Sequence, residues 1–168
     1  MRPNIPCPFE KKYPSELNRD DAYFMTLAYN LAIDAYNADE VPVGAVIVNE
    51  GQVIASARNQ VEELKDATAH AEMLCITQAT QKLGDWRLGG CALYVTKEPC
   101  PMCAGALMLS RIGKVIYAVA DPKMGGVGGV LNIHQMPGSF HRYESVNFKG
   151  PLQEECTALL QAFFTKKR

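Results

Sequence analysis

The chain has 168 residues, of which 48% are hydrophobic, so it can fill one sizeable core in a single domain. A net charge of −1 argues against the strongly basic class of nucleic-acid binders, and no apolar run is long enough to cross a membrane. There is no signal-peptide pattern, and six cysteines fit a reducing compartment better than a disulfide framework, so we expect a cytoplasmic protein. Residues 1–83 carry 7 Lys and Arg against 12 Asp and Glu, whereas residues 84–168 carry 10 against 6. The second half of the chain could therefore form a local basic surface.

The first part of the chain divides at about residue 20. Residues 1–20 hold four prolines among charged residues, which predicts an irregular N-terminal extension before a domain at 21–168. A helix is expected from Asp20 or Asp21 to about Asn37, with apolar residues on one stripe. The β-branched runs at 43–49 and 52–57, on either side of Glu50-Gly51, predict a β-hairpin.

Two short stretches with zinc-ligand spacing follow. The apolar spacing of Ala69 to Leu83 predicts a helix that starts near His70 and Glu72. After a strand at 91–96, Pro101 fits the first position of a helix, which places Cys100 at the N-cap and Cys103 in the first turn. The positive end of a helix dipole favours the thiolate that a metal requires. We therefore expect two helix N-termini to converge on one cation.

The residue types predict a catalytic zinc site. His70, Cys100 and Cys103 are three ligands, which leave the fourth tetrahedral position for a water, and Glu72 can move the protons of that water. Bound zinc lowers the pKa of water from about 15.7 to roughly 7, so one Zn²⁺ per subunit would supply hydroxide at neutral pH. A structural zinc would need a fourth protein ligand and would have no use for the carboxylate.

The remaining elements complete an α/β pattern. Strands are expected at 114–119 and 143–148, with a possible short helix at 130–135 between them, and a final helix at 152–164. The connection between these two strands is long enough for a crossover, so they should run parallel. Alternating strands and helices predict an α/β protein, a three-layer α/β/α fold around a five-stranded mixed sheet. His134, on the short helix, is expected at the surface.

The chain contains five motifs: Val-Pro-Val-Gly-Ala-Val at 41–46, Thr-Ala-His-Ala-Glu at 68–72, Glu-Pro-Cys-Pro-Met-Cys-Ala-Gly-Ala at 98–106, Asp-Pro-Lys with glycines at 121–129, and Phe163-Phe164. These motifs resemble those of one family, the bacterial tRNA-specific adenosine deaminases, over about Asp21 to Lys166. Gly129, Phe140 and Ala67 stand where that family commonly has Ser, Asn and Pro. The resemblance implies a cytidine-deaminase-like fold with the fourth and fifth strands parallel, and a homodimer. The glycines after Asp121 lack the Gly-Lys-Ser/Thr of a phosphate-binding loop, so no nucleotide cofactor is expected.

The resemblance also implies a reaction and a substrate. The signature H-x-E followed by P-C-x-x-C belongs to zinc nucleobase deaminases, in which hydroxide adds to C6 of adenine while the glutamate, here Glu72, passes a proton to ring N1. The implied substrate is the wobble adenosine of a tRNA anticodon stem-loop, converted to inosine. For Asn59 a turn-forming role, and for Phe164 simple packing, remain open beside a role in binding. The implied substrate-binding residues are Asn59, Val41, Pro42, Asp121 and Phe164.

Two other functions fit parts of the sequence. A free purine base or nucleoside deaminase, such as a guanine deaminase, shares the glutamate and the cysteine pair, although that family usually has cysteine as its first ligand. An RNA-binding module with a structural zinc is the non-enzymatic alternative. Release of ammonia separates an enzyme from such a module.

Overall fold

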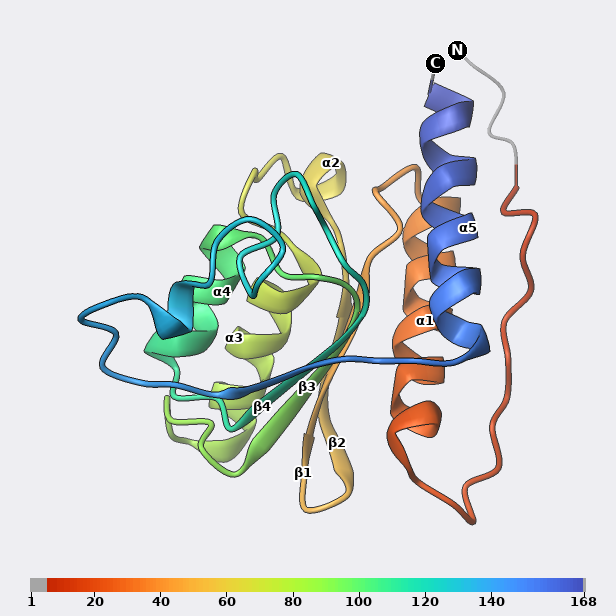
Figure 1. Ribbon diagram of the computed structural model, residues 1–168. Helices are drawn as coiled ribbons and strands as arrows, with labels where there is room; N and C mark the ends of the chain where they lie inside the picture. Colours follow the sequence, from red (N-terminus) through yellow and green to blue (C-terminus); the bar gives the residue numbers. More distant parts are fainter. Residues whose placement is uncertain (1–5, 168) are drawn as a thin grey trace.

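The computed structural model describes residues 6–167 as three layers, with helices on both faces of one sheet (Figure 1). Helices α1 and α5 cover one face, and α3 and α4 cover the other. The strands are β1 (Gly44–Asn49), β2 (Gln52–Arg58), β3 (Cys91–Lys97), β4 (Lys114–Val119) and β5 (Glu144–Asn147). The helices are α1 (Asp21–Asn37), α2 (Val61–Leu64), α3 (Ala71–Leu83), α4 (Pro101–Leu109), the 3₁₀ helix η1 (Ile133–Gln135) and α5 (Pro151–Lys167).

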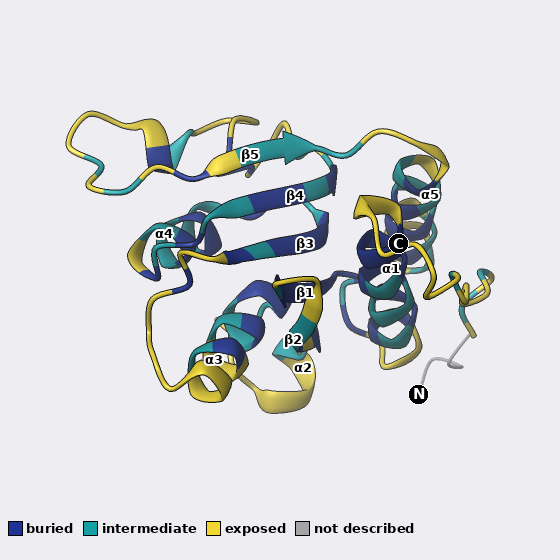
Figure 2. Ribbon diagram, turned by 90° about the horizontal axis from the view of Figure 1, so that it is seen from below, coloured by how far each residue is buried: buried dark blue, intermediate teal, exposed yellow. Residues whose placement is uncertain are grey.

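The sheet has the predicted mixed topology. Its strand order is β2-β1-β3-β4-β5 (Figure 2), with β1 antiparallel to both β2 and β3. β3, β4 and β5 run parallel, which confirms the crossover expected between the fourth and fifth strands. The C-terminal ends of β3 and β4 therefore lie side by side, with Lys97 opposite Val119. The candidate functional site lies at this edge of the sheet.

The central strands carry buried side chains on both faces, so each strand contributes to two apolar cores. On β3, Leu93 packs toward α3 and α4, whereas Tyr94 packs toward α1 and α5. On β4, Val115 and Ile116 divide in the same way, because successive side chains of a strand point to opposite faces. Figure 2 shows β3 mostly in the dark blue of buried residues, and β4 in dark blue and in the teal of intermediate ones. Burial on both faces fixes the register of these strands, and with it the ends from which the site is built.

Helix boundaries follow local chemistry. Asp20 is the N-cap of α1, and its carboxylate accepts a hydrogen bond of 2.9 Å from the Tyr23 N–H. Gly84 ends α3 in a left-handed conformation with φ of 67°. The helix expected from Ala69 begins at Ala71, with His70 as its N-cap.

Two features differ from the sequence-based expectations. The four-residue helix α2 was not predicted, because so short an element has no apolar periodicity. His134 was expected at the surface, which is wrong: its side chain is 1% exposed. Its ring stacks on Tyr143, with 3.9 Å between the ring centroids and 11° between the planes. A single 3₁₀ turn has no sequence pattern that reveals which side faces the core.

The N-terminal segment from residue 6 to residue 20 contains no helix or strand and lies along α1 (Figure 1). The side-chain amide of Asn30 on α1 accepts from the Lys12 N–H at 2.8 Å and donates to the Lys12 carbonyl at 2.6 Å. The Cys7 N–H donates to Asn37 at 2.9 Å. The division into an extension at 1–20 and a domain at 21–168 stays a prediction, and residues 1–5 lie outside the described part.

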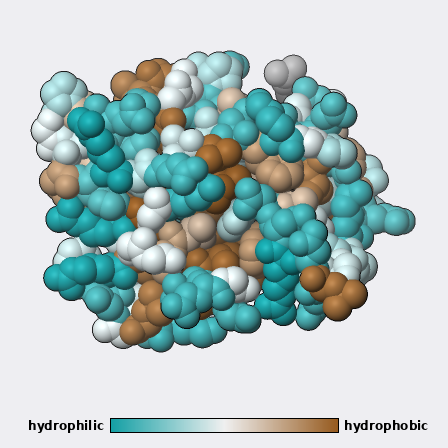
Figure 3. All heavy atoms as spheres, turned by 60° about the horizontal axis from the view of Figure 1, so that its bottom comes forward, coloured by the Kyte–Doolittle hydropathy of each residue, from teal (hydrophilic) through white to brown (hydrophobic). Residues whose placement is uncertain are grey.

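The surface is mainly hydrophilic on the face drawn in Figure 3, with separate brown areas of hydrophobic residues among the teal. Within residues 6–167, every helix is too short or too polar to span a bilayer.

Candidate metal centre and active site

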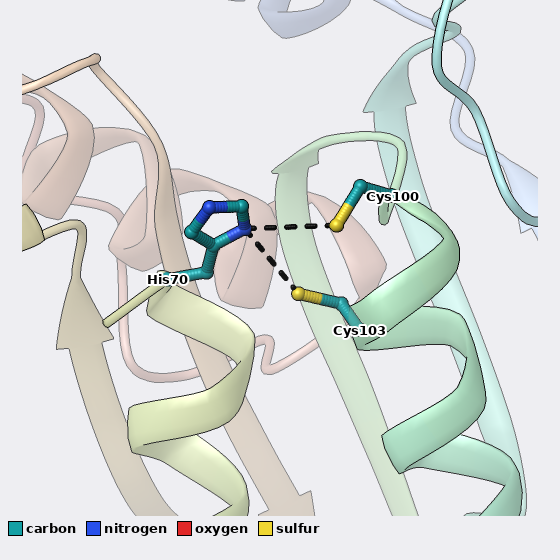
Figure 4. Close-up of side chains that lie close together, drawn as sticks. All are labelled: His70, Cys100 and Cys103. Atoms are coloured by element: carbon teal, nitrogen blue, oxygen red, sulfur yellow. Dashed lines mark hydrogen bonds between the residues drawn. The ribbon is translucent and has the colours of Figure 1, made fainter. Parts of the chain in front are cut away.

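His70, Cys100 and Cys103 lie together where the first turns of α3 and α4 meet (Figure 4). The His70 Nδ1 atom is 3.7 Å from the Cys100 Sγ and 3.5 Å from the Cys103 Sγ. All three ligand atoms lie within 4.8 Å of one another. The two predicted helix N-termini therefore do converge, and the three side chains form a group that could hold a metal ion.

The distances fit a tetrahedral metal centre. An ion bound at about 2.0 Å from nitrogen and about 2.3 Å from sulfur holds these atoms about 3.6 Å apart, close to the two distances in the structure. Among the described residues, the group contains three such side chains and no fourth His, Cys, Asp or Glu. This donor set leaves one coordination position for a non-protein ligand, which is typical of catalytic rather than structural sites.

The start of α4 prepares the two thiols for a metal. Cys100 is the N-cap and Pro101 the first helical residue, so both thiols lie at the positive end of the α4 dipole. Hydrogen bonds from the Cys103 thiol, from the His70 ring and from the Cys103 N–H lower the pKa of the Cys100 thiol to about 4, despite its burial. The pKa of Cys103 is raised, because its thiol donates to Cys100 and is itself buried. One of the two thiols is thus already suited to bind as a thiolate.

Asn59, at the end of β2, fixes the start of α3. Its side-chain oxygen accepts a hydrogen bond of 2.9 Å from the Ala71 N–H, one of the helix N–H groups without an intrahelical partner. His70 makes no capping hydrogen bond with its own side chain, so Asn59 provides the cap from a neighbouring element. The imidazole remains directed at the sulfurs.

Glu72 lies in the first turn of α3 and is buried, with 4% of its surface exposed. Burial raises the pKa of its carboxyl group above the ordinary value, and its own backbone N–H and the positive charges of His70 and Lys97 offset only part of this effect. A buried carboxyl group of raised pKa beside a metal-binding group is the arrangement expected of a general acid and base.

A cavity of about 580 Å³ opens at this group of side chains. Its walls bring together several residues predicted from the sequence. Within the described part of the chain, Pro42, Asp121 and Cys103 do not line it: Cys103 is fully buried behind the cavity, and Asp121 contacts the wall through Lys97. The predicted site residues in the wall are Val41, Asn59, His70, Glu72, Cys100 and Phe164.

Glu98 organises the segment that follows β4, a role that sequence reasoning missed. Its side chain is 2% exposed, and its carboxylate accepts hydrogen bonds from the Asp121, Val127 and Gly129 N–H groups at 2.8, 3.1 and 2.8 Å. A Cβ atom at Gly129 would overlap the Asp121 carbonyl oxygen and the Glu98 carboxylate. Glycine at 129, a departure from the related family, therefore suits the close packing here.

Two more charged residues of the cavity wall were not predicted. Glu40 is 2% exposed and accepts a hydrogen bond of 2.8 Å from the Glu63 N–H, which fixes α2 beside the cavity. Lys97, the last residue of β3, forms an ion pair with Asp121. The only sequence signal for these residues was their position next to recognised motifs. The Nε2 atom of His141 lies 2.7 Å from the Ile112 carbonyl oxygen.

Known proteins resemble the chain over most of its length. A family model described as MafB19-like deaminase matches residues 18–168. A tRNA-specific adenosine deaminase of Aquifex aeolicus (strain VF5) is 52% identical over 146 residues, which cover 87% of this chain and 95% of the relative.

Solved structures of known proteins also resemble this chain. One, from a study of A-to-I editing by tRNA:A34 deaminases at the wobble position of transfer RNA, aligns with a TM-score of 0.74 and 43% identity, over 76% of this chain and 98% of that chain. A guanine deaminase of Bacillus subtilis aligns with a TM-score of 0.59 and 31% identity, over 87% of this chain and 94% of that chain. The likeness is thus greater to the tRNA enzymes than to that purine-base enzyme. The chain belongs to the family of tRNA-specific adenosine deaminases, among the MafB19-like deaminases.

Proposed function

We propose that the protein is a zinc-dependent hydrolase that converts adenosine to inosine at the wobble position of a tRNA anticodon. The observation that carries the proposal is the joint placement of the His70, Cys100 and Cys103 ligand atoms and the buried Glu72 carboxyl group at one cavity. Membership of the tRNA-specific adenosine deaminases supports the substrate.

Zinc is the proposed metal. One imidazole nitrogen and two thiolate sulfurs suit zinc, and the separations of the three donor atoms match its tetrahedral bond lengths. When bound, the ion would lower the pKa of a water and so supply the hydrolytic nucleophile at neutral pH. One ion per subunit is expected.

Glu72 is the proposed proton carrier. It accepts a proton from the attacking water and donates it to N1 of adenine, which makes C6 electrophilic; it then assists the departure of ammonia. The pKa of Glu72 is raised by burial, so the carboxyl group holds the transferred proton more readily than an exposed glutamate would. The reaction consumes water and yields inosine and ammonia.

The cavity walls suit an extruded base. Val41, Val43 and Phe164 provide apolar surface, and Asn59 adds a polar group beside His70. An adenine in an anticodon loop is already outside a duplex, so moving it into a pocket costs little energy. Asn59, Val41, Pro42, Asp121 and Phe164 remain the proposed substrate contacts.

The proposal is tested by incubating the zinc-loaded protein with an anticodon stem-loop that carries a wobble adenosine. Free adenosine, cytidine and guanine are tested in parallel, with ammonia and nucleoside products measured by chromatography. We expect inosine in the RNA and no turnover of the free compounds.

Other outcomes select other functions. Turnover of guanine alone would select the purine-base deaminase and reject the RNA substrate. Tight binding of the stem-loop with no ammonia from any compound, by protein with a full complement of zinc, would select an RNA-binding module.

We further propose a homodimer, as expected from the resemblance. Leu109 at the end of α4 is 61% exposed, and η1 packs beside α4. The segment between β4 and β5 exposes further apolar side chains, and these support an interface with a second copy of the chain. Light scattering should give twice the chain mass of 18.5 kDa, and Leu109→Glu should shift the protein toward monomer. A wild-type monomer would reject the dimer. The exposed side chains are Met124, Val130, Leu131, Met136 and Phe140.

A tRNA substrate also fits the cytoplasmic location expected from the sequence.

A further inference from the structure

An ion pair connects the cavity wall to the segment after β4. Lys97 ends β3 and lines the cavity, and its Nζ contacts the Oδ2 atom of Asp121. The two side chains are 27% and 12% exposed, so the pair is only partly accessible to solvent. The parallel pairing of β3 with β4 brings the two residues together, because it ends with Lys97 opposite Val119.

The rest of Asp121 is also held in place. Its Oδ1 atom accepts hydrogen bonds from the Lys123 and Met124 N–H groups at 3.0 and 3.1 Å. Its own N–H donates to Glu98 at 2.8 Å. Burial tends to raise the pKa of Asp121, but the hydrogen bonds from Lys97 and the two N–H groups outweigh it and hold the pKa below the ordinary value. The carboxylate is therefore charged at neutral pH.

An uncompensated negative charge on Asp121 would repel the phosphates of an RNA strand that approaches the cavity. The cavity wall already carries more acidic than basic side chains, and each phosphate of an approaching strand adds a negative charge. Lys97 is the basic side chain of the wall that pairs with Asp121. The acidic residues of the wall are Asp39, Glu40, Glu62, Glu72 and Glu98, and the lysines are Lys97 and Lys167.

We propose that Lys97 is a positioning residue for the RNA strand: it holds the Asp121 carboxylate at the edge of the cavity and cancels its charge, so that the phosphates flanking the target adenosine can approach. Lys97 acts through Asp121 and does not contact the reacting atoms. The inference rests on the proposed function, since it concerns binding of the same RNA.

The inference predicts how substitutions of Lys97 and Asp121 should combine in their effects on RNA binding. Lys97→Met leaves an uncompensated carboxylate and should weaken RNA binding about fivefold, the upper end of the scale expected for a partly exposed ion pair. Lys97→Arg keeps the charge and should bind nearly as the wild type does. In Lys97→Met/Asp121→Asn the repelling charge is gone, so binding should return to within about twofold of Asp121→Asn alone.

Lys123→Met is the matched control. Lys123 is exposed, lies two residues after Asp121 and contacts the carboxylate through its backbone N–H, so its substitution removes the same charge and leaves the pair intact. Any loss of binding caused by Lys123→Met should be the same in the wild-type and in the Asp121→Asn background, so Asp121→Asn should not rescue it.

The experiment measures binding of a fluorescent anticodon stem-loop by anisotropy at two salt concentrations, together with single-turnover inosine formation at saturating RNA. The loss of binding caused by Lys97→Met should shrink at higher salt, whereas the rate at saturation reports separately the effect of the Lys97 charge on the pKa of Glu72. Thermal unfolding of each variant provides a readout of any purely structural effect.

The outcomes separate the two proposals. Unchanged binding by Lys97→Met, or a loss that Asp121→Asn does not rescue, would overturn the role of Lys97; the second result would mean that the ammonium binds phosphate directly. Wild-type protein that binds the RNA without forming inosine would reject the proposed function, and the binding comparison would still decide the role of Lys97. Wild-type protein that does not bind the RNA would overturn both.

Discussion

Glu72 lies in an environment unlike that of an ordinary surface glutamate. It is buried, it lies two residues after a metal ligand, and its pKa is raised by loss of solvent. Burying a carboxyl group costs free energy, and the raised pKa means that the surroundings of Glu72 offset only part of this cost. The placement therefore favours a chemical role.

Replacing Glu72 with Gln tests this role. The variant keeps the shape of the side chain and the three metal ligands, so zinc content measured by mass spectrometry should be unchanged. Loss of proton transfer should reduce inosine formation about 10²- to 10⁴-fold. Glu154→Gln, at an exposed position at the start of α5, is the control for the same chemical change. Near-normal turnover by zinc-loaded Glu72→Gln would remove Glu72 from its role.

His134 makes stability depend on pH. Burial lowers its pKa below the ordinary 6.5, with smaller effects from Arg142 and His141. The Tyr143 N–H donates to its Nδ1, and among residues 6–167 its buried Nε2 has no hydrogen-bond partner. Above pH 6.5 the ring is neutral in both the folded and unfolded states. As the pH falls below this value, the unfolded state takes up a proton before the folded state does, so the free energy of unfolding decreases.

His134→Phe should flatten this dependence. The phenyl ring can still stack on Tyr143, but no group titrates, so the loss of unfolding free energy between about pH 7.5 and about pH 5.5 should be smaller than in the wild type. Denaturant unfolding at both pH values measures the difference. Tyr143→Phe keeps the histidine and should retain the wild-type dependence. Equal slopes for His134→Phe and the wild type would contradict the prediction.

At the scale of elements, the site depends on contacts between segments that are distant in the chain. Asn59 at the end of β2 caps α3, and Glu98 at the end of β3 binds three N–H groups of the segment after β4. Each contact connects the end of a strand to the backbone of another element. The geometry of the metal ligands is therefore set by neighbouring elements as well as by the helices that carry them.

Substitutions of Asn59 can separate capping from substrate binding. Asn59→Ala removes the acceptor for the Ala71 N–H and should lower the free energy of unfolding by about 1–2 kcal/mol. Asn59→Asp keeps an oxygen acceptor but loses the amide donor, so it should recover most of the stability. If Asn59 also binds the nucleoside, Asn59→Asp should still turn over RNA poorly. Thermal unfolding and inosine formation, measured on both variants, would show whether the two effects separate.

The elements that the sequence predicted well are those with local signals. Asp20 as an N-cap and Pro101 at the first position of α4 mark helix starts, and the β-branched runs of β1 and β2 flank a turn, so these boundaries were within one or two residues. The ligands of the candidate metal site were identified for the same reason, by their spacing. Glu98 and His134 could not be placed, because no short sequence pattern encodes their contacts. The partners of Glu98 lie 23, 29 and 31 residues away, and Tyr143 lies 9 residues from His134.

At the scale of the whole molecule, a bound metal would connect α3 and α4, which otherwise make few direct contacts. His70 begins α3 and the two cysteines begin α4, so a bound ion cross-links both to each other over the same face of the sheet. A ligand that binds only the folded state stabilises it by an amount that grows with the logarithm of its concentration. Metal content should therefore control stability as well as activity.

Removing the metal with a chelator should lower the melting temperature and abolish turnover, and adding Zn²⁺ should restore both. A site filled at a concentration about 1,000 times its Kd contributes about 4 kcal/mol to the free energy of unfolding. Cys103→Ala removes one ligand, so its melting temperature should respond much less to chelator or zinc. Calorimetry of both proteins with and without chelator measures the difference; identical responses would place the stabilising metal elsewhere.

The far end of α5 also forms part of the cavity wall, through Phe163, Phe164 and Lys167, and Asp39 anchors its lysines. Proteolytic trimming of this last turn, or an affinity tag fused after it, would alter substrate entry while the zinc ligands stay intact. Preparations with ragged C-termini would then contain molecules of equal metal content and unequal affinity for RNA, so purification handles belong at the other terminus.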